Sequence, residues 1–264
     1  MIQNNQISVI TICFNNPAEL RNTLDSLNSQ TTPPFEHLII DGSNNDEIRI
    51  LLQEDMYIKT WRRSIHEKDN GISDAFNKGI TQSKGSWILM LNAGDRFYDI
   101  NSLKALNESV NSNEHIQWLH AKYQLNRGWI DVVIGKPHDA SKVYRGMRSI
   151  CHQTMLVNRS LYEKYGNYDT SLKFGMDYDF LLRIKDEPFY FLPEPIIRYD
   201  TTGLSSVNYL ESLKQSGNIY RKHFGNSIKQ RLWAFRLKVL HFLLHSPVGK
   251  ILYRMKTMLR LENM

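Results

Sequence analysis

The sequence predicts a mixed α/β fold, in which a mostly parallel sheet is flanked by helices and followed by a helical C-terminal extension. Short apolar, β-branched runs alternate with stretches of helical periodicity over residues 7–95, which is typical of βαβ units. A polar cluster directly follows three of these apolar runs. Basic residues gather near the C-terminus, where helical spacing dominates.

The first predicted unit is a strand, a helix and a second strand. The apolar run Ile7 to Phe14 predicts a buried strand. Asn16 then offers a helix N-cap and Pro17 a first helical residue. The pair Pro33-Pro34 ends this helix, and residues 37–40 predict a second buried strand.

The same alternation continues as far as Asp95. We expect a helix near Ile48 to Leu52, a short strand at Ser64 to His66, a helix from Ile72 to Ile80, and a strand at Trp87 to Leu91. Ligands bind at the carboxyl ends of the strands in such sheets. The polar clusters predicted at those ends are Thr11 to Asn15, Asp41 to Ser43 and Asn92 to Asp95.

The second half of the chain mixes strands and helices. Residues 118–134 predict a hairpin that turns at Asn126-Arg127-Gly128, and residues 142–149 predict a loop. The further expected elements are a helix at 161–165 stopped by Gly166, a helix at 177–184, an extended segment at 189–199, and helices from Ser206 onward that are split at Pro247.

Composition excludes several classes of protein. Of the 264 residues 41% are hydrophobic and 23% are charged, which is ordinary for a globular protein and excludes a disordered or collagen-like chain. Cys13 and Cys151 are the two cysteines, too few for a disulfide framework, so we expect a reducing compartment. The polar start of the chain predicts no signal peptide, and no apolar run approaches the ~20 residues of a spanning helix.

The net charge of +6 arises at one end of the chain. Residues 221–260 contain ten Lys or Arg and no acid, which leaves a net charge of −4 on the rest. A basic segment is compatible with nucleic acid, with an anionic membrane surface or with phosphorylated substrates.

Familiar phosphate and metal motifs are absent from the sequence. It contains no P-loop, no Gly-x-Gly-x-x-Gly fingerprint, no zinc-ligand spacing and no Gly-x-Ser-x-Gly elbow. A sheet that binds a nucleotide without a P-loop needs another way to neutralise the phosphates. A divalent cation held by a carboxylate at a strand end would do so, and Asp95 has that position.

Six segments together resemble the family 2 glycosyltransferases of the bacterial surface-polysaccharide type, which have the GT-A fold. The resemblance covers about residues 7–205. The matching segments are Ser8 to Asn15, Phe35 to Ser43, Glu67 to Gly79, Leu91 to Asp95, Cys151 to Gln153 and Gly175 to Asp179.

The resemblance implies a role for each matching polar residue. Thr11 and Asn15 would line the nucleobase pocket, and Asp41 would hydrogen-bond the base, which is uracil in most such enzymes. The residues implied beside the ribose, diphosphate and donor sugar are Asp69, Asp74, Asn77 and Lys78.

The resemblance also implies the reacting groups. Asp95 would hold Mn²⁺ or Mg²⁺, Asp177 would be the catalytic base, and His152 and Gln153 would lie on the donor or acceptor side of the cleft. The metal stabilises charge on the departing nucleoside diphosphate, and the base takes a proton from the acceptor hydroxyl in one inverting displacement.

The sequence departs from the family pattern in two places. Asn92 and Gly94 stand where relatives often have acids, which leaves Asp95 alone in the metal motif. Met176 precedes Asp177 where the family often has Glu. Asp179 is a rival base, but it is displaced by about 200° around a helix, so the two carboxylates do not face the cleft equally.

We therefore expect a GT-A domain at residues 1–205, with a donor-binding half at about 1–112 and an acceptor-binding half at about 113–205. Residues 206–264 would form a helical, basic, amphipathic extension. Its apolar side chains are Leu232, Trp233, Phe235, Val239, Leu240, Phe242, Leu243, Ile251, Leu252, Met255 and Leu259, interleaved with Arg231, Arg236, Lys238, Lys250, Arg254, Lys256 and Arg260. Such a pattern suits a helix in a membrane interface, or one packed on the domain or on a second subunit.

The leading hypothesis is a metal-dependent inverting transferase that moves a hexose or N-acetylhexosamine from a UDP-sugar to a lipid-linked saccharide in O-antigen, capsule or exopolysaccharide biosynthesis. It would be cytoplasmic and peripheral on the inner membrane. The alternatives are a nucleotidyltransferase and a non-catalytic protein that binds nucleic acid or membrane. Each polar residue also has a structural alternative, such as a turn at Asp41 or a helix cap at Asp95.

Overall fold

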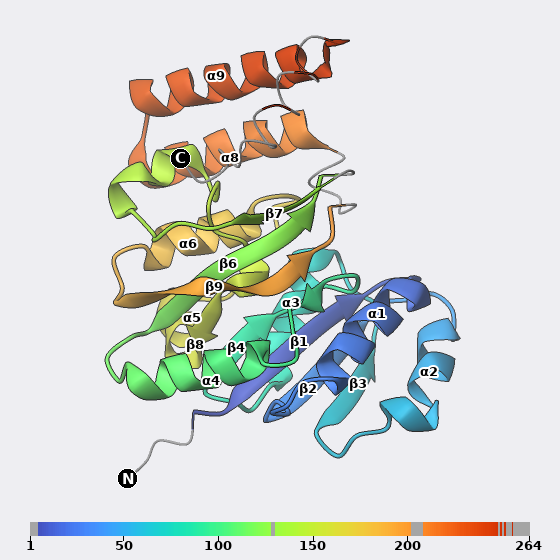
Figure 1. Ribbon diagram of the computed structural model, residues 1–264. Helices are drawn as coiled ribbons and strands as arrows, with labels where there is room; N and C mark the ends of the chain where they lie inside the picture. The colour runs from blue at the N-terminus through green and yellow to red at the C-terminus, as the bar shows by residue number, and fades with distance from the viewer. Residues whose placement is uncertain are drawn as a thin grey trace.

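The computed structural model describes residues 5–127, 130–201 and 208–247, together with residues 249, 251 and 255. One mixed sheet forms its centre (Figure 1). Within the described residues the strand order is β3-β2-β1-β4-β8-β6-β9-β5, and β7 pairs with β6. The predicted α/β fold, with a mixed, mostly parallel sheet flanked by helices, is confirmed.

The first half of the chain is a run of parallel βαβ units. Its elements are β1 (Ile7–Cys13), α1 (Pro17–Asn28), β2 (Glu36–Asp41), α2 (Glu47–Leu52), a 3₁₀ helix (Asp55–Tyr57), β3 (Arg62–His66), α3 (Ile72–Gln82) and β4 (Trp87–Met90). β1 is parallel to both β2 and β4, and β2 is parallel to β3. The strand order therefore reverses at β1, which is where open α/β sheets bind ligands. Every element predicted in this half is present.

The second half completes the sheet with mixed pairings. Its elements are β5 (Arg96–Phe97), α4 (Ser102–Ser112), β6 (Trp118–Asn126), β7 (Asp131–Ile134), 3₁₀ helices (Ala140–Arg145 and His152–Thr154), β8 (Leu156–Asn158), α5 (Arg159–Tyr165), α6 (Met176–Ile184) and β9 (Phe189–Tyr199). The β6–β7 hairpin is confirmed. β8 is antiparallel to β4 and β6, whereas β6 and β9 are parallel. The sequence did not predict β5, α4 or β8.

Helices cover both faces of the sheet. Alternate residues of β1 point to opposite faces, so Ile10 packs in a core with α3, α5 and α6, while Val9 packs in a second core with α1 and α4. Cys13 lies in a third cluster beneath α1 and α2. Asn16 precedes α1, but its side chain accepts from the backbone of Phe14 and caps no helical N–H.

Two helices follow the sheet, α8 (Tyr209–Phe224) and α9 (Ile228–His245). In Figure 1 they lie above α6, on the side of the molecule away from α1 and α2. Gly225, with a φ of 72°, separates them, so the predicted helical region breaks here before Pro247. Ile219 anchors α8 in an apolar cluster with Val143, Tyr178 and Leu182.

Some sequence predictions concern residues outside the described part. The predicted domain boundary at 205/206 lies within 202–207, which is outside this part. The distal amphipathic residues Lys250, Leu252, Arg254, Lys256, Leu259 and Arg260 are also outside it. Among the helices that the structure does describe, none combines the length and apolar character needed to cross a membrane.

Candidate active site

A cavity of about 350 Å³ opens at the carboxyl end of β4, next to the first turn of α6. Its polar lining residues are Asn92, Asp95, His152, Gln153, Lys173, Asp177 and Asp200. The structure thus brings together four side chains predicted from three separate motifs: Asp95, His152, Gln153 and Asp177.

Asp95 lies at the buried end of this group and is 2% exposed. Its Oδ2 accepts a hydrogen bond of 2.8 Å from Gln153 Nε2, and its Oδ1 accepts one of 2.8 Å from the backbone N–H of Asp200. Burial raises the pKa of the Asp95 carboxyl to about 6, although these two donors and His152 oppose the rise. The carboxylate is fixed in place by its donors and lies close to its titration range at neutral pH.

Gln153 is a positioning residue for Asp95. It is 1% exposed, its amide nitrogen is committed to Asp95, and its Oε1 accepts from Cys151 Sγ at 2.6 Å. Burial raises the pKa of the Cys151 thiol well above its usual value, so the thiol remains a neutral donor. The contacts from Cys151 to Gln153 and from Gln153 to Asp95 fix the orientation of the Asp95 carboxylate.

Asp177 occupies the first turn of α6. Gly175 precedes the helix with a φ of 74°, and a Cβ there would lie 3.0 Å from Ile219 Cδ1 of α8, so a glycine is required at this turn. Asp177 Oδ2 lies 3.2 Å from His152 Nδ1, and Oδ1 accepts from the backbone N–H of Tyr178 at 2.8 Å.

The ionised form of Asp177 is favoured. Burial alone would raise the pKa of its carboxyl, but the hydrogen bond and charge of His152 and the backbone N–H of Tyr178 outweigh burial, so the pKa is lowered. Asp95 and Asp177 therefore have pKa values displaced in opposite directions.

Two polar atoms in the cavity are buried without a hydrogen-bond partner among the described residues, Asn92 Oδ1 and His152 Nε2. Both residues line the same cavity as the Asp95 carboxylate. Each oxygen of that carboxylate has lone pairs beyond the one that its donor uses. The cavity thus contains the Asn92 oxygen and the remaining lone pairs of Asp95 as unused acceptors, and His152 Nε2 is a further acceptor when the imidazole is neutral.

These acceptors fit a divalent cation that takes the rest of its ligands from a substrate. Among the described residues, no group of three or more His, Cys, Asp or Glu side chains could hold a metal by itself. Mg²⁺ is commonly bound by one or two carboxylates together with substrate phosphates. Asp95 supplies one carboxylate for such a site, and Asn92 Oδ1 is an unpaired oxygen in the same cavity.

The carboxyl ends of β1, β2 and β3 form a second polar group. Asp41 Oδ2 lies 2.6 Å from His66 Nδ1, and Asp41 Oδ1 accepts from the backbone N–H of Ser43 at 2.9 Å. Asn15, with a φ of 52°, donates its backbone N–H to Ser43 Oγ at 2.8 Å. A Cβ at Gly42 would lie 1.9 Å from Asp69 Oδ2, so only glycine allows Asp69 to approach.

Thr11 does not face this edge. It is fully buried, and its hydroxyl lies 2.9 Å from His37 Nε2. The two-residue repeat of β1 points Thr11 to the face that α1 and α2 cover. The predicted contact of its side chain with a nucleobase is wrong, since the side chain instead links β1 to β2.

Asn77 also has a structural contact. Its Nδ2 donates to the carbonyl of Tyr168 at 2.9 Å, and its Oδ1 accepts from the N–H of Tyr168 at 2.9 Å. Both ends of the amide are used to fasten α3 to the loop before α6, so the structure gives no support to its predicted place beside the donor.

Lys78, Asp74 and Asp69 lie near one another at the start of α3. Lys78 Nζ is 2.9 Å from Glu67 Oε1 and 3.7 Å from Asp74 Oδ2, while Asp69 Oδ1 accepts from the N–H of Gly71 at 2.9 Å. None of the three lines the cavity of Asp95, so they form part of the other polar group, at the ends of β1 to β3.

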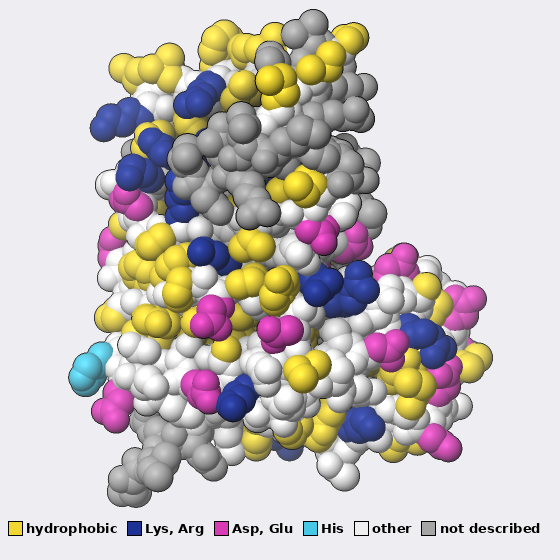
Figure 2. All heavy atoms as spheres, viewed as in Figure 1, with side chains coloured by type: hydrophobic (Ala, Val, Ile, Leu, Met, Phe, Trp, Pro, Cys, Tyr) yellow, Lys and Arg dark blue, Asp and Glu magenta, His cyan; other side chains and the backbone are white. Residues whose placement is uncertain are grey.

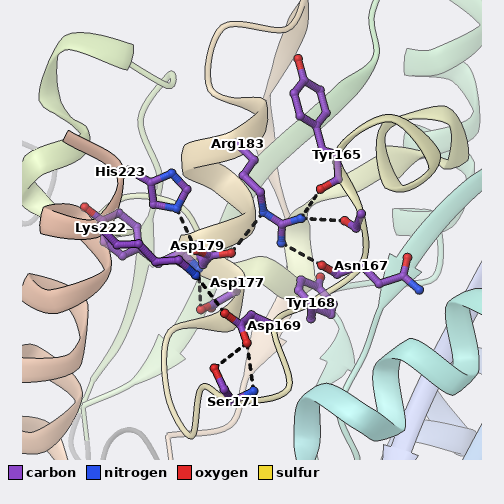
Figure 3. A network of polar contacts seen from close by, with 12 residues as sticks. Tyr165, Asn167, Tyr168, Asp169, Ser171, Asp177, Asp179, Arg183, Lys222 and His223 are labelled. Carbon is purple, nitrogen blue, oxygen red and sulfur yellow. Dashed lines mark hydrogen bonds and ion pairs between the residues drawn. The ribbon is translucent and has the colours of Figure 1, made fainter.

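Asp179 has a structural position. It is 3% exposed, and its two oxygens lie 3.1 Å from Arg183 Nε and 2.8 Å from His223 Nε2 of α8. Figure 3 shows this network, in which Lys222 of α8 also pairs with Asp169. Asp179 thus ties α6 to α8, and the preference for Asp177 as the base agrees with this geometry.

Asp200 is a residue that the sequence analysis missed. It follows β9 directly, lines the cavity, and donates its backbone N–H to Asp95. A Cβ at Gly94 would lie 2.8 Å from Asp200 Oδ2. Because β9 is parallel to β6 and runs in the direction of β4, its carboxyl end meets the same edge. The strand-end rule applied to β9 would have found it.

The model of the family described as "Glycosyl transferase family 2" matches residues 8–166. A curated "PGL/p-HBAD biosynthesis glycosyltransferase" of Mycobacterium bovis is 28% identical over 221 residues, which are 82% of this chain and 81% of that protein.

Two solved structures are similar in fold. TarS residues 1–349 of S. aureus in complex with UDP superposes with a TM-score of 0.60 at 16% identity, over 90% of this chain and 72% of that chain. A mannosyltransferase, PcManGT from Pyrobaculum calidifontis, was solved with GDP-Man and Mn²⁺. It has a TM-score of 0.62 at 13% identity, over 97% of this chain and 80% of that chain.

Proposed function

The chain belongs to glycosyltransferase family 2, which uses nucleotide-sugar donors, and from that premise we propose that it is an inverting, metal-dependent hexosyltransferase with a UDP-sugar donor and a lipid-linked saccharide acceptor. The observation that carries the proposal is the meeting of Asp95 and Asp177 in one cavity at the carboxyl edge of the sheet. The donor sugar would be a hexose or an N-acetylhexosamine, and the product a surface polysaccharide such as O-antigen, capsule or exopolysaccharide.

Asp177 would be the general base. Its lowered pKa keeps the carboxylate ionised at neutral pH, and His152 Nδ1, 3.2 Å away, holds one of its oxygens in place. The acceptor hydroxyl would give its proton to this carboxylate as its oxygen attacks the anomeric carbon. One displacement inverts the configuration and needs no covalent intermediate. Such a base contributes ~10²–10⁴ to the rate.

Asp95, with Asn92 and His152, would hold Mn²⁺ or Mg²⁺. The cation supplies charge stabilisation to the departing nucleoside diphosphate. Gln153 and the N–H of Asp200 keep the Asp95 carboxylate oriented toward that site. The Mn²⁺ bound with GDP-Man in PcManGT supports a divalent cation here.

The nucleoside would lie along the carboxyl ends of β1 to β3, beside Asn15, Asp41 and Asp69. Asp41 is oriented by His66 and Ser43, and its carboxylate suits the N–H of uracil. Lys78 and Asp74 would lie nearer the diphosphate. The UDP in the TarS complex supports uracil, whereas the GDP-Man in PcManGT supports guanine as the competing base.

The outer face of α9 supports contact with a membrane. Four of its apolar side chains are strongly exposed: Ile228 (77%), Leu232 (64%), Phe235 (66%) and Phe242 (67%). Figure 2 shows yellow apolar and dark blue basic side chains at the α9 end of the molecule and magenta acidic side chains lower down. An apolar stripe with Lys and Arg beside it suits the surface of an anionic leaflet. We propose that the protein lies on the cytoplasmic face of the inner membrane.

The first test is the thermal stability of the purified protein with UDP, GDP, CMP or dTDP, each with and without Mn²⁺. A ligand that binds only the folded state raises the melting temperature by mass action. We expect a Mn²⁺-dependent rise with UDP and slow hydrolysis of the matching nucleotide sugar. A rise in melting temperature with GDP alone would indicate a GDP-sugar donor in place of a UDP-sugar. Diphosphate release from a nucleoside triphosphate would support the nucleotidyltransferase alternative, and no rise with any nucleotide would contradict the proposal.

A further inference from the structure

A basic cavity lies beside the candidate active site, between the 3₁₀ helix Ala140–Arg145 and α9. Its volume is about 490 Å³, and the cationic side chains on its walls are Lys136, Lys142, Arg145, Arg148 and Arg236. Asp139 is the one carboxylate among the described lining residues, and its Oδ2 is already 2.5 Å from Lys142 Nζ. The cavity therefore carries a large excess of positive charge.

Three of these cations surround one indole ring. The guanidinium carbons of Arg145, Arg148 and Arg236 lie 5.1, 5.2 and 5.2 Å from the ring centroid of Trp233. Trp233 is 8% exposed, and its Nε1 donates to the carbonyl of Arg145 at 3.2 Å. The indole thus joins α9 to the 3₁₀ helix and holds the arginines close together.

Within the described residues no carboxylate forms an ion pair with any of these three guanidiniums. Partial burial and the charges of Arg236 and Arg145 lower the pKa of Arg148. Three like charges gathered in one place repel one another unless an anion compensates them. A phosphate matches the fork of an arginine, because its oxygens accept two parallel N–H bonds.

A second cavity shares wall residues with both the basic cavity and the active site. That cavity has a volume of about 310 Å³ and shares Arg145 and Trp233 with the basic cavity. It also shares Gly175 and Asp177 with the cavity of Asp95. The arginines and the proposed base therefore line neighbouring cavities.

We propose that Arg145, Arg148 and Arg236 form a binding site for a phosphate or diphosphate ester carried by the acceptor. The phosphate is held by the arginines, and the saccharide attached to it extends through the middle cavity to Asp177. This assignment rests on the proposed function, because it concerns the acceptor of the same reaction. An anionic phospholipid head group has the same chemistry, and the test separates the two sources.

The test measures binding of farnesyl diphosphate, a short isoprenoid diphosphate, by calorimetric titration in EDTA without nucleotide, so that the metal-dependent donor site does not compete. Farnesol is the control for the diphosphate group. The variant Arg148→Gln/Arg236→Gln removes two charges of the site. The matched control Arg49→Gln/Lys104→Gln removes two charges from side chains that are each 54% exposed and lie far from it in the sequence.

We expect the wild type and the control to bind farnesyl diphosphate and not farnesol, and Arg148→Gln/Arg236→Gln to bind it about tenfold more weakly or worse. The Mn²⁺-dependent melting shift with UDP should be the same in all three proteins, which shows that the fold and the donor site are intact. Absence of that shift in the wild type would count against the proposed function, and the binding of farnesyl diphosphate in EDTA would still be read independently.

Two results would overturn the proposal. The first is no binding of farnesyl diphosphate by the wild type, and the second is equal binding by the wild type and Arg148→Gln/Arg236→Gln. In the second case, vesicles of phosphatidylglycerol compared with vesicles of phosphatidylcholine test the phospholipid alternative. If the substitution weakens binding to phosphatidylglycerol vesicles alone and leaves farnesyl diphosphate binding unchanged, the arginines serve a phospholipid head group and not the acceptor.

Discussion

The two sides of the molecule satisfy their polar groups in different ways. At the carboxyl ends of β1 to β3, Asp41 is paired with His66 and Lys78 with Glu67. Beneath α9, Arg148 and Arg236 crowd round Trp233 with no carboxylate partner among the described residues. The first side is organised by its own hydrogen bonds before any ligand arrives, whereas the second carries charge that a ligand would compensate. The contrast is between an edge organised by its own contacts, where we propose the donor binds, and a cationic surface where we propose the acceptor phosphate binds.

The largest predicted effect separates two aspartates of α6. Asp177→Asn should lower kcat by ~10²–10⁴, because the amide cannot accept the proton of the acceptor hydroxyl. Its melting temperature and its binding of UDP with Mn²⁺ should change little. Turnover with a nucleotide sugar and a suitable acceptor, measured beside the melting curve, checks this.

Asp179→Asn is the matched comparison on the same helix. It should leave Arg183 without its buried partner and weaken the link to His223, at a cost of about 3 kcal/mol in unfolding free energy. Activity per folded molecule should stay closer to that of the wild type than in Asp177→Asn. If Asp179→Asn abolished turnover while remaining stable, and Asp177→Asn stayed active, the two assignments would have to be exchanged.

The next effect concerns Asp95 and the stability of the metal-free protein. Its folded-state pKa of about 6 lies above the ordinary value of 3.8, so the folded protein binds this proton more tightly than the unfolded chain. Burying the ionised form therefore costs about 3 kcal/mol above pH ~6, and the cost fades as the pH falls through the window toward 4.

Asp95→Asn should remove that cost and also the activity. In EDTA at pH 7.5 its unfolding free energy should exceed that of the wild type by up to about 3 kcal/mol, and the advantage should shrink by pH 4.5. Denaturant unfolding at the two pH values measures it. A variant that is less stable than the wild type at pH 7.5 would contradict the idea that burial dominates at this carboxyl.

The same contrast explains what could be predicted from sequence. β1, β2 and β4 were predicted because each is a short apolar run with a helix beside it in the chain, so local pattern decides their structure. β3, with the sequence RRSIH, has no such apolar run. β5 has two residues and β8 three, too short to leave a pattern. The antiparallel pairing of β8 with β4 depends on contacts about 70 residues apart, such as Trp87 with Asn158, which no local window contains.

The site was predictable to the extent that the motifs follow strand ends or begin a helix. Asp95 and Asp177 were both named from sequence, and the structure brings them together. The direction in which the Thr11 side chain points could not be predicted, because its partner His37 lies on another strand. The amide of Asn77 likewise binds a backbone segment 91 residues away. These roles are set by tertiary contacts and not by local sequence.

A smaller effect tests the exposed stripe of α9. Phe235→Ser/Phe242→Ser should weaken binding to phosphatidylglycerol vesicles about a hundredfold, because each ring would lose about 1.5 kcal/mol of apolar burial. Flotation or sedimentation with vesicles measures the partition. Ile50→Ser/Met56→Ser is the control, since these side chains are 64% and 52% exposed on the donor half.

Unchanged vesicle binding by Phe235→Ser/Phe242→Ser would contradict membrane contact through α9. We would then expect the exposed apolar stripe of α9 to pack against a second copy of the chain. Sedimentation equilibrium of the wild type and of this variant would show whether the substitutions dissociate an oligomer.

The smallest effect concerns the donor half, where Thr11 and Asn15 differ in role although they are four residues apart. Thr11→Val should cost about 1 kcal/mol of stability, since it removes the hydroxyl that His37 Nε2 contacts in the core. Its affinity for UDP with Mn²⁺ should stay within about twofold, because a change below ~0.4 kcal/mol is expected at a side chain that does not touch the ligand. Asn15→Ala should weaken UDP binding several-fold, because Asn15 Oδ1 organises the loop by accepting from the N–H of Asn44 at 3.1 Å, and it should also cost some stability, because Asn15 has a φ of 52°. Titration of UDP into both variants, beside their melting curves, compares the two.

A loss of UDP binding in Thr11→Val at unchanged stability would contradict the structural role of Thr11. It would mean that the Thr11 side chain contacts the nucleobase, as the sequence predicted.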